Sequence, residues 1–212
     1  PGALLGAGIA VGVTVGVGKS GAIQRLVLVG VAVSALCSAF TSIFLVIDEA
    51  QLATVMSWLS GRLAGVRLDD IIPALIAVLV VVPLTLVGAK TLDLLVAGDA
   101  VAGAVGAKPE RTRLAAIVAA VVLIAPAVAA TGPIGFLGLM AAAVAWRVCG
   151  PHHRMGLCVA GIIGAAVLLV ADSVGQAIWV PAETPVGIVT SLAGMPLVLW
   201  SVHALGRRKH VA

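Results

Sequence analysis

Few side chains in this sequence could do chemistry, and those that could lie singly between long apolar stretches. The triplet Gly18-Lys19-Ser20 resembles the end of a phosphate-binding P-loop, whose backbone N–H groups curl around phosphate. That loop requires a glycine where this chain has Val13, and the strand-to-helix context of a P-loop is missing. We therefore do not expect this segment to bind a nucleotide.

A metal site would need several histidine, cysteine or carboxylate ligands brought together. His152 and His153 are adjacent beside Arg154, but no further ligand is spaced to join them, so a solvated basic loop is the better interpretation. The cysteines show no C-x-x-C spacing, which argues against a disulfide framework and a metal site and favours packing roles. They are Cys37, Cys149 and Cys158.

Two acidic residues, Asp172 and Glu183, could form a proton relay, because acids inside a membrane segment are functional by default. Asp172, however, lies about 26 Å along its apolar segment, which places it near the far interface. Glu183 follows the same segment. A hydrated rim explains both residues better than a relay, and we expect neither a catalytic residue nor a bound cofactor in this chain.

The composition indicates what must position these residues. Of the 212 residues, 61% are hydrophobic and 10% are charged, and the mean hydropathy is +1.21. Apolar runs of about 20 residues match the thickness of a hydrocarbon core. The short segments of alternating polarity that are typical of a membrane β-barrel are absent from the sequence. The sequence therefore predicts an all-α, polytopic transmembrane helical bundle that forms a single domain over residues 1–212.

About seven membrane segments can be read from the apolar runs. Residues 48–70 mix acids and arginines with apolar side chains, which predicts an extracytoplasmic amphipathic helix at the interface. Residues 114–146 are too many for one crossing, so the chain must turn at Thr131-Gly132-Pro133, because proline lacks an N–H and restricts its predecessor. The predicted segments are 1–17, 26–47, 71–89, the two halves of the turned run, 155–180 and 184–206.

The basic residues divide very unequally between the two sides of this predicted bundle. When the segments alternate, Arg62 and Arg67 lie on one side and every other lysine and arginine lies on the opposite side. Positive residues mark cytoplasmic loops, so the polar stretch 98–113 and the C-terminus are cytoplasmic in this interpretation. The net charge of +4 is dispersed between apolar segments, and we expect no nucleic acid partner.

Several short segments follow one another in a distinctive order and spacing. They are Trp58-Leu59 with Gly61 and Leu63-Ala64, Gly98-Asp99-Ala100-Val101-Ala102 with Gly106, GPIGFLGL at 132–139, Gly150-Pro151-His152-His153-Arg154, Ala171-Asp172, PAETPVGIVT at 181–190 and Gly194-Met195-Pro196. Together they resemble the FecCD family, the permease subunits of ABC importers for ferric siderophores, haem and cobalamin. The resemblance runs from about residue 26 to the C-terminus.

The resemblance implies a transport subunit whose cytoplasmic coupling loop, 98–113, docks a separate ABC ATPase that hydrolyses ATP. It also implies an extracytoplasmic substrate-binding protein that meets a rim containing Gln176 and Glu183, a second permease copy or paralogue, and membrane lipid of the bacterial cytoplasmic membrane. The implied docking residues are Gly98, Asp99, Val101, Ala102 and Gly106. The implied structural positions are Gly132, Pro133, Gly135, Gly138, Pro185, Gly187, Gly194 and Pro196.

A complete permease of this family would have roughly ten helices, so this chain would hold about the last seven. It begins in apolar sequence at Pro1 without a methionine, and we expect its natural start upstream. The chain departs from the family pattern at Gly103 and Trp146, where arginine is usual, and at Ala142-Ala143, which replaces a Pro-His pair. An iron-siderophore importer, with cobalamin or haem as variants, is the first hypothesis. A truncated, non-transporting remnant and an ion-coupled carrier are the alternatives.

Overall fold

The computed structural model describes residues 23–47, 52–96, 98–178 and 185–196, together with a few positions between 6 and 16. Within these ranges the chain is helical and contains no strand. The expectation of an all-helical fold is therefore confirmed for the described residues. The predicted segment 1–17, residue Glu183 and the basic C-terminal residues fall wholly or mostly outside them.

Among the described residues, four helices are long and apolar enough to cross a membrane. They are α2 (Ile23–Ile47), α4 (Leu68–Val96), α6 (Pro109–Thr131) and α8 (His153–Ile178). At 23 to 29 residues, they would extend about 35–44 Å. Shorter helices are α3 (Leu52–Leu59), α5 (Asp99–Ala104), α7 (Leu137–Cys149) and Val186–Pro196. Four of the roughly seven expected segments thus have spanning length within the described part of the chain.

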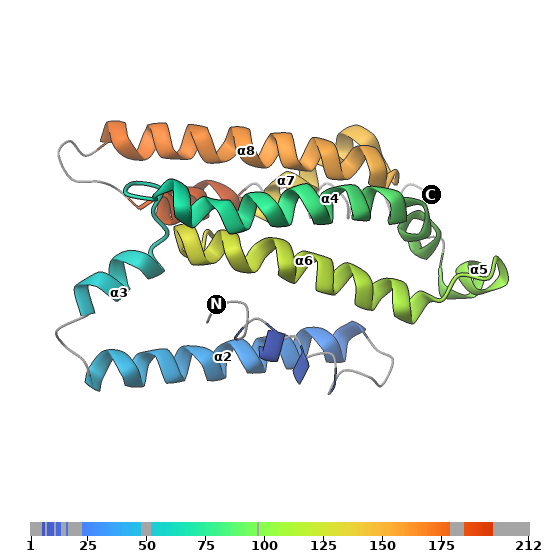
Figure 1. Ribbon diagram of the computed structural model, residues 1–212, viewed down its shortest axis with the longest axis horizontal. Coiled ribbons are helices and arrows are strands. Elements are labelled where there is room, and N and C mark those ends of the chain that lie inside the picture. Colours follow the sequence, from blue (N-terminus) through green and yellow to red (C-terminus); the bar gives the residue numbers. More distant parts are fainter. Residues whose placement is uncertain are drawn as a thin grey trace.

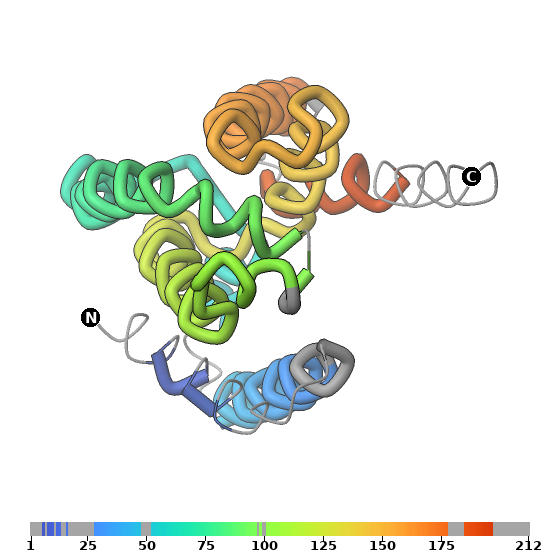
Figure 2. Tube along the Cα trace, turned by 90° about the vertical axis from the view of Figure 1, so that its right-hand side faces the viewer, coloured from blue at the N-terminus to red at the C-terminus, as the bar shows by residue number. Residues whose placement is uncertain are grey.

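Four of the helices, α4, α6, α7 and α8, form two packed pairs. Helix α4 packs against α6 and helix α7 packs against α8, while a smaller contact between α4 and α8 joins the pairs. Figure 2 shows the two pairs from one end, with α2 lying apart from them. In Figure 1, α3 lies at one end of the bundle and α5 at the other. We call these ends the α3 end and the α5 end.

Two of the predicted segments have different limits in the structure. Residues 48–70 were expected to form one amphipathic helix, but α3 covers only Leu52–Leu59, and a turn containing Gly61 and Gly65 with positive φ separates it from α4. The acids Asp69 and Asp70 belong to the first turn of α4, where carboxylates favour the helix dipole. At its other end α4 runs on past the expected residue 89 to Val96.

The predicted break between α6 and α7 is present at Gly132. The helix α6 ends at Thr131, and Gly132 adopts φ 75°, a conformation that strains any L side chain. A Cβ atom added to Gly132 would lie 2.1 Å from the carbonyl oxygen of Trp58. This residue therefore has to be glycine both for its dihedral angles and for the close approach of another backbone segment.

Three segments that are distant in sequence meet at this point, and we call their meeting the glycine junction: residues 58–62, 131–136 and 185–195. The backbone N–H of Arg62 donates to the carbonyl oxygen of Thr131 at 2.8 Å. A Cβ on Gly187 would lie 2.4 Å from the carbonyl oxygen of Ser60, and one on Gly194 would lie 2.6 Å from Phe136 Cβ. The three segments can thus approach this closely only because glycines, which have no side chain, lie at the contact points.

The substitution Gly132→Ala should destabilise the protein by at least about 2 kcal/mol, because it adds both an unfavourable φ and a backbone clash. The matched control is Gly138→Ala, in the same GPIGFLGL segment. No heavy atom lies within 4 Å of a Cβ at Gly138, and its φ is not in the positive range. Thermal unfolding in detergent should show a lower midpoint for the first variant only. Equal midpoints for both would contradict this account of the junction.

Candidate functional site

The α5 end carries the segment that the sequence singled out, residues 98–113. Instead of one loop, the structure contains the short helix α5, a turn, and then the first residues of α6, which starts at Pro109. Glu110, Arg111 and Arg113 are therefore helical. Figure 1 shows α5 projecting beyond the long helices. A helix in this position is open to contact from outside the bundle.

Two glycines set the limits of α5. Gly98 has φ 108° and ψ 153°, a region that is essentially restricted to glycine, and its carbonyl oxygen accepts a bond from Ala102 N at 3.0 Å. Gly106 has φ 82° and follows the last turn. The backbone N–H of Ala107 then donates to the Ala102 carbonyl oxygen at 3.0 Å. The chain enters and leaves α5 through conformations that other residues would strain.

The side chains of α5 divide into an inner and an outer face. Ala102 is completely buried, whereas Val101 and Val105 are 48% and 67% exposed. Val101 and Val105 are one helical turn apart and so lie on one face. Asp99 begins the helix, and its side chain lies outside the described part of the structure. The helix α5 itself contacts α4 and α6.

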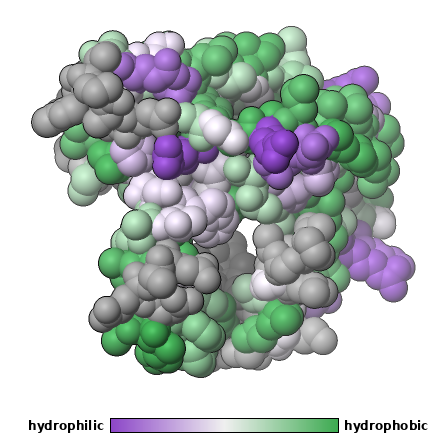
Figure 3. Space-filling view, turned by 60° about the vertical axis from the view of Figure 1, so that its left-hand side comes forward, coloured by the Kyte–Doolittle hydropathy of each residue, from purple (hydrophilic) through white to green (hydrophobic). Residues whose placement is uncertain are grey.

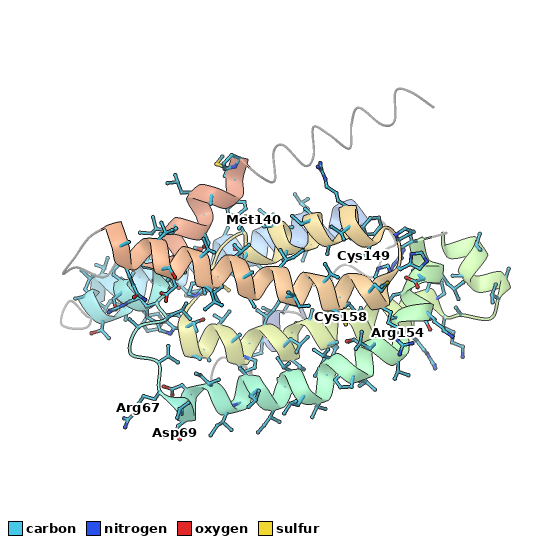
Figure 4. The ribbon with its side chains drawn as sticks, turned by 90° about the horizontal axis from the view of Figure 1, so that it is seen from above. Arg67, Asp69, Met140, Cys149, Arg154 and Cys158 are labelled. Atoms are coloured by element: carbon cyan, nitrogen blue, oxygen red, sulfur yellow. The ribbon has the colours of Figure 1, made fainter. Side chains whose placement is uncertain are left out.

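Charged residues separate along the bundle. At the α3 end, Arg67 and Asp69 lie together, while Arg154 is near the opposite end (Figure 4). Figure 3 shows hydrophilic patches at the α3 end beside hydrophobic surface. The helix directions place further basic residues at the α5 end, namely Lys90, Lys108, Arg111, Arg113 and Arg147. This is the separation that the alternating segments predicted for these residues.

An unexpected pair joins α4 to α8 at the α5 end. The Asp93 carboxylate oxygen Oδ1 accepts from the backbone N–H of His153 at 2.8 Å and lies 2.6 Å from His153 Nδ1. Because a carboxylate oxygen only accepts, the ring nitrogen carries the hydrogen. The His153 ring also meets the ring of Trp146 edge to face, with centroids 6.3 Å apart.

The interpretation of His153 as part of a solvated loop was therefore wrong. Its side chain is 24% exposed, and that of Asp93 is 35% exposed. Its neighbours His152 and Arg154 are exposed, as expected. The sequence separates Asp93 and His153 by 60 positions. The sequence shows only that an acid lies at the end of one span and a histidine at the start of another. This pattern is a weak signal for a contact, because it does not indicate that the two residues lie close together.

The predicted outer rim is described only in part. Gln176 is exposed in the last turns of α8, and its Nε2 donates to Asp172 Oδ2 at 2.8 Å. Asp172 is half-buried six residues before the end of α8 at Ile178, near the α3 end as expected. Glu183 lies outside the described residues. The structure therefore places one rim residue on an exposed surface and leaves the other undescribed.

A groove of about 810 Å³ lies beside the glycine junction. Most of the surface that lines it is apolar, and the hydroxyl-bearing residues Ser60 and Ser191 are part of its lining. Several predicted structural positions also line it, namely Pro133, Gly135, Gly187 and Pro196. Of the others, Pro185 precedes the Val186–Pro196 helix, Gly132 and Gly194 make the close approaches described above, and Gly138 has open space around it.

Metal ligands do not gather anywhere in the described ranges. No group of three histidine, cysteine or acidic side chains there could hold an ion. The three cysteines are free, and Cys37 and Cys158 are exposed on α2 and α8, so packing inside this chain does not explain them. Cys149 and Cys158 are labelled in Figure 4 on neighbouring helices. The described part of the chain thus provides helices, a groove and two polar ends.

Comparison with known proteins shows which family has this sequence pattern and this helical arrangement. The sequence matches the FecCD transport family over residues 1–204. The chain belongs to the FecCD transport family. A solved metal-chelate type ABC transporter in an inward-facing conformation superposes with a TM-score of 0.84 at 29% sequence identity, covering 93% of this chain and 64% of the solved chain. The helical arrangement is therefore that of an ABC transporter membrane subunit.

Similar curated proteins in this family are import permeases. The chain is 36% identical over 177 residues to the iron(3+)-hydroxamate import system permease protein FhuG of Bacillus subtilis (strain 168), covering 83% of this chain and 53% of that protein. It is 38% identical over 175 residues to the cobalamin import system permease protein BtuC of Halobacterium salinarum, covering 82% and 47%. It is 36% identical over 183 residues to the hemin transport system permease protein HmuU of Yersinia pestis, covering 86% and 55%.

These alignments also show how much of such a protein is present. The FecCD chain spans about half the length of the curated relatives it matches. With four helices of spanning length among the described residues, it is a multi-pass membrane protein.

The substitution Gly98→Ala should loosen α5, because alanine cannot adopt φ 108° without strain. Amide hydrogen exchange of Ala102, Val105 and Ala107 in detergent should accelerate by about fivefold or more. The control is Gly103→Ala within α5, where a Cβ meets no heavy atom within 4 Å and φ is not positive. Similar exchange in both variants would show that Gly98 does not define the helix.

Proposed function

We propose that this FecCD chain is a translocation subunit of an ATP-binding-cassette importer for ferric-siderophore complexes. The observation that carries the proposal is the match to the FecCD family over residues 1–204. It is supported by curated relatives that are named as permeases for ferric hydroxamate, ferric dicitrate and ferric enterobactin. The apolar helices provide the membrane path, and a separate ATPase subunit provides the energy.

The α5 end faces the cytoplasm in this proposal and meets the ATPase. The concentration of lysine and arginine at that end supports this orientation, since positive residues mark the cytoplasmic side. In this proposal the C-terminus also lies on the cytoplasmic side of a bacterial inner membrane. The docking residues are Gly98, Asp99, Val101, Ala102 and Gly106, of which exposed Val101 offers an apolar contact.

The α3 end then faces outward and receives cargo from an extracytoplasmic substrate-binding protein. Exposed Gln176, next to the Asp172 carboxylate, supports a polar rim there, and Glu183 completes that rim in our proposal. Complementary charges at such a rim guide association more than they raise affinity. The segment 48–70 belongs to the same outer surface.

A second permease chain, identical or paralogous, completes the path across the membrane, and lipid surrounds the assembly. This proposal is supported by the many apolar side chains that the described helices leave exposed, including Phe44, Leu84 and Leu169 at about 70%. Apolar surface on this scale requires lipid or protein around it. The complete subunit has roughly ten helices in this proposal, with about seven in the present chain.

Two alternatives follow from specific observations, and the third can be distinguished by experiment. Cobalamin or haem is the nearest variant of the cargo, because BtuC and HmuU are among the similar proteins. A non-transporting remnant is favoured by Gly103 and Ala142-Ala143, which depart from the family pattern. An ion-coupled carrier would continue to transport when the ATPase is inactive.

Uptake of labelled ferric siderophore by vesicles that contain the complete system, with and without this chain, tests the proposal. We expect uptake that requires this chain, ATP and an active ATPase. Labelled haem and cobalamin, offered in parallel, identify the cargo. Uptake that persists with an inactive ATPase would favour a carrier, and uptake that is the same without the chain would favour a remnant.

The substitution Asp99→Lys should release the ATPase, because it reverses the charge at the first residue of α5. We expect roughly tenfold less ATPase to co-purify with the permease, which corresponds to about 1.4 kcal/mol of binding free energy. Asp69→Lys is the matched control, since it reverses an acid in the first turn of α4 at the opposite end. Equal co-purification of the two variants would exclude docking through α5.

A further inference from the structure

The two helix pairs of this permease do not have equal access to α5. Helix α5 packs against α4 and α6, which form one pair. The other pair, α7 and α8, is joined to the first through the contact between α4 and α8. Figure 2 shows α7 and α8 on the far side of α4 from α2. A displacement of α5 therefore reaches the second pair through the packing of α4 against α8 and through any contact that joins the two pairs near that end.

The Asp93 carboxylate lies where such a connection is needed. Asp93 is in the last turn of α4, and the chain continues through Gly98, whose N–H donates to the Leu95 carbonyl oxygen at 3.2 Å, directly into α5. Oδ1 of Asp93 receives the backbone N–H of His153, the first residue of α8. The same oxygen contacts His153 Nδ1 at 2.6 Å.

The connection also extends to α7. The ring of Trp146, near the end of α7, meets the His153 ring edge to face at an interplanar angle of 87°. The turn between α7 and α8 also borders a partly open pocket of about 110 Å³, whose lining includes Ala142, Ala145, Gly156 and Ala160 together with both rings. These alanines and the glycine offer few side-chain atoms for packing, so the polar contact from Asp93 helps to hold the turn in place.

We propose that Asp93 is a positioning residue that makes the beginning of α8 move together with the end of α4. A displacement of α5 is then passed to the α7–α8 pair as well as to α4 and α6. The inference rests on the proposed function of the chain as a transporter subunit. It assigns to Asp93 a role in coupling, through His153, without contact to the cargo or the ATPase.

The test uses the complete transporter in vesicles and measures cargo moved per ATP hydrolysed. For Asp93→Ala, we expect normal co-purification of the ATPase, ATP hydrolysis within about twofold of wild type, and roughly three- to tenfold less cargo per ATP. Asp93→Asn should retain most of the ratio, because both contacts of His153 are made to Oδ1 and an amide oxygen can accept there.

The control is Thr85→Ala. Thr85 lies on the same helix, and its Oγ1 donates to the carbonyl oxygen of Val82 at 2.8 Å, within α4. The variant loses a local bond without separating the helix pairs, so the ratio should stay at the wild-type value. A wild-type ratio in Asp93→Ala, or an equal loss in Thr85→Ala, overturns the inference.

A second arm applies if Asp93→Ala fails to assemble. The pair Asp93→Cys and His153→Cys is introduced with the native cysteines replaced by alanine, and the two thiols are joined by a short cross-linker. We expect the cross-linked transporter to recover cargo per ATP relative to the reduced one. Loss of transport on cross-linking overturns the inference. Absence of uptake by the wild-type system instead counts against the proposed function itself, so the two failures remain distinguishable.

Discussion

The arrangement of the helices depends on hydrogen bonds that satisfy the backbone at two helix ends. Within a helix, each N–H finds its carbonyl in the same segment, but the N–H groups of the first turn and the carbonyl groups of the last turn have no partner there. At the end of α6, the Thr131 carbonyl oxygen receives the N–H of Arg62. At the beginning of α8, the N–H of His153 finds Asp93. In both places the missing partner comes from a distant segment, so satisfying a helix end also fixes how the helices are arranged.

The two ends of the bundle use different means for this purpose. The glycine junction brings backbone against backbone, and a Cβ at Gly132 or Gly187 would fall within 2.4 Å of a carbonyl oxygen. Backbone contacts this close leave the three segments little freedom to slide past one another. At the α5 end, one carboxylate and two rings make the connection over a small cavity. Side-chain contacts of this kind can persist while the helices tilt.

The four long helices could be predicted from the sequence, because the length of an apolar run is a local property. The break at Gly132 and Pro133 could be predicted as well, because residues 114–146 are too many for one crossing. The helix α5 was not predicted, since its six residues are too few to show a helical period and its limits depend on Gly98 and Gly106. Asp69 and Asp70 were assigned to the interfacial helix 48–70, but they belong to α4. Their charge alone does not distinguish a helix on the membrane surface from the first turn of a spanning helix.

A candidate site could be proposed from the sequence only where its residues form short continuous motifs. The segment around Asp99 stands out by polarity, and the glycines of the junction stand out by resemblance to a family. The contact between Asp93 and His153 depends on how α4 and α8 pack against each other. The residues adjacent to either one in the sequence contain no information about that packing.

The difference between the two ends of the bundle bears on how a transporter with this arrangement of helices would work. A lever needs a fixed point at one end and a transmitted displacement at the other. The glycine junction has the close backbone contacts expected of a fixed point, and α5 projects from the opposite end. A force on α5 would then tilt α4 and α6 about the junction. Whether α7 and α8 follow then depends on the packing of α4 against α8 and, near the α5 end, on the contact between Asp93 and His153.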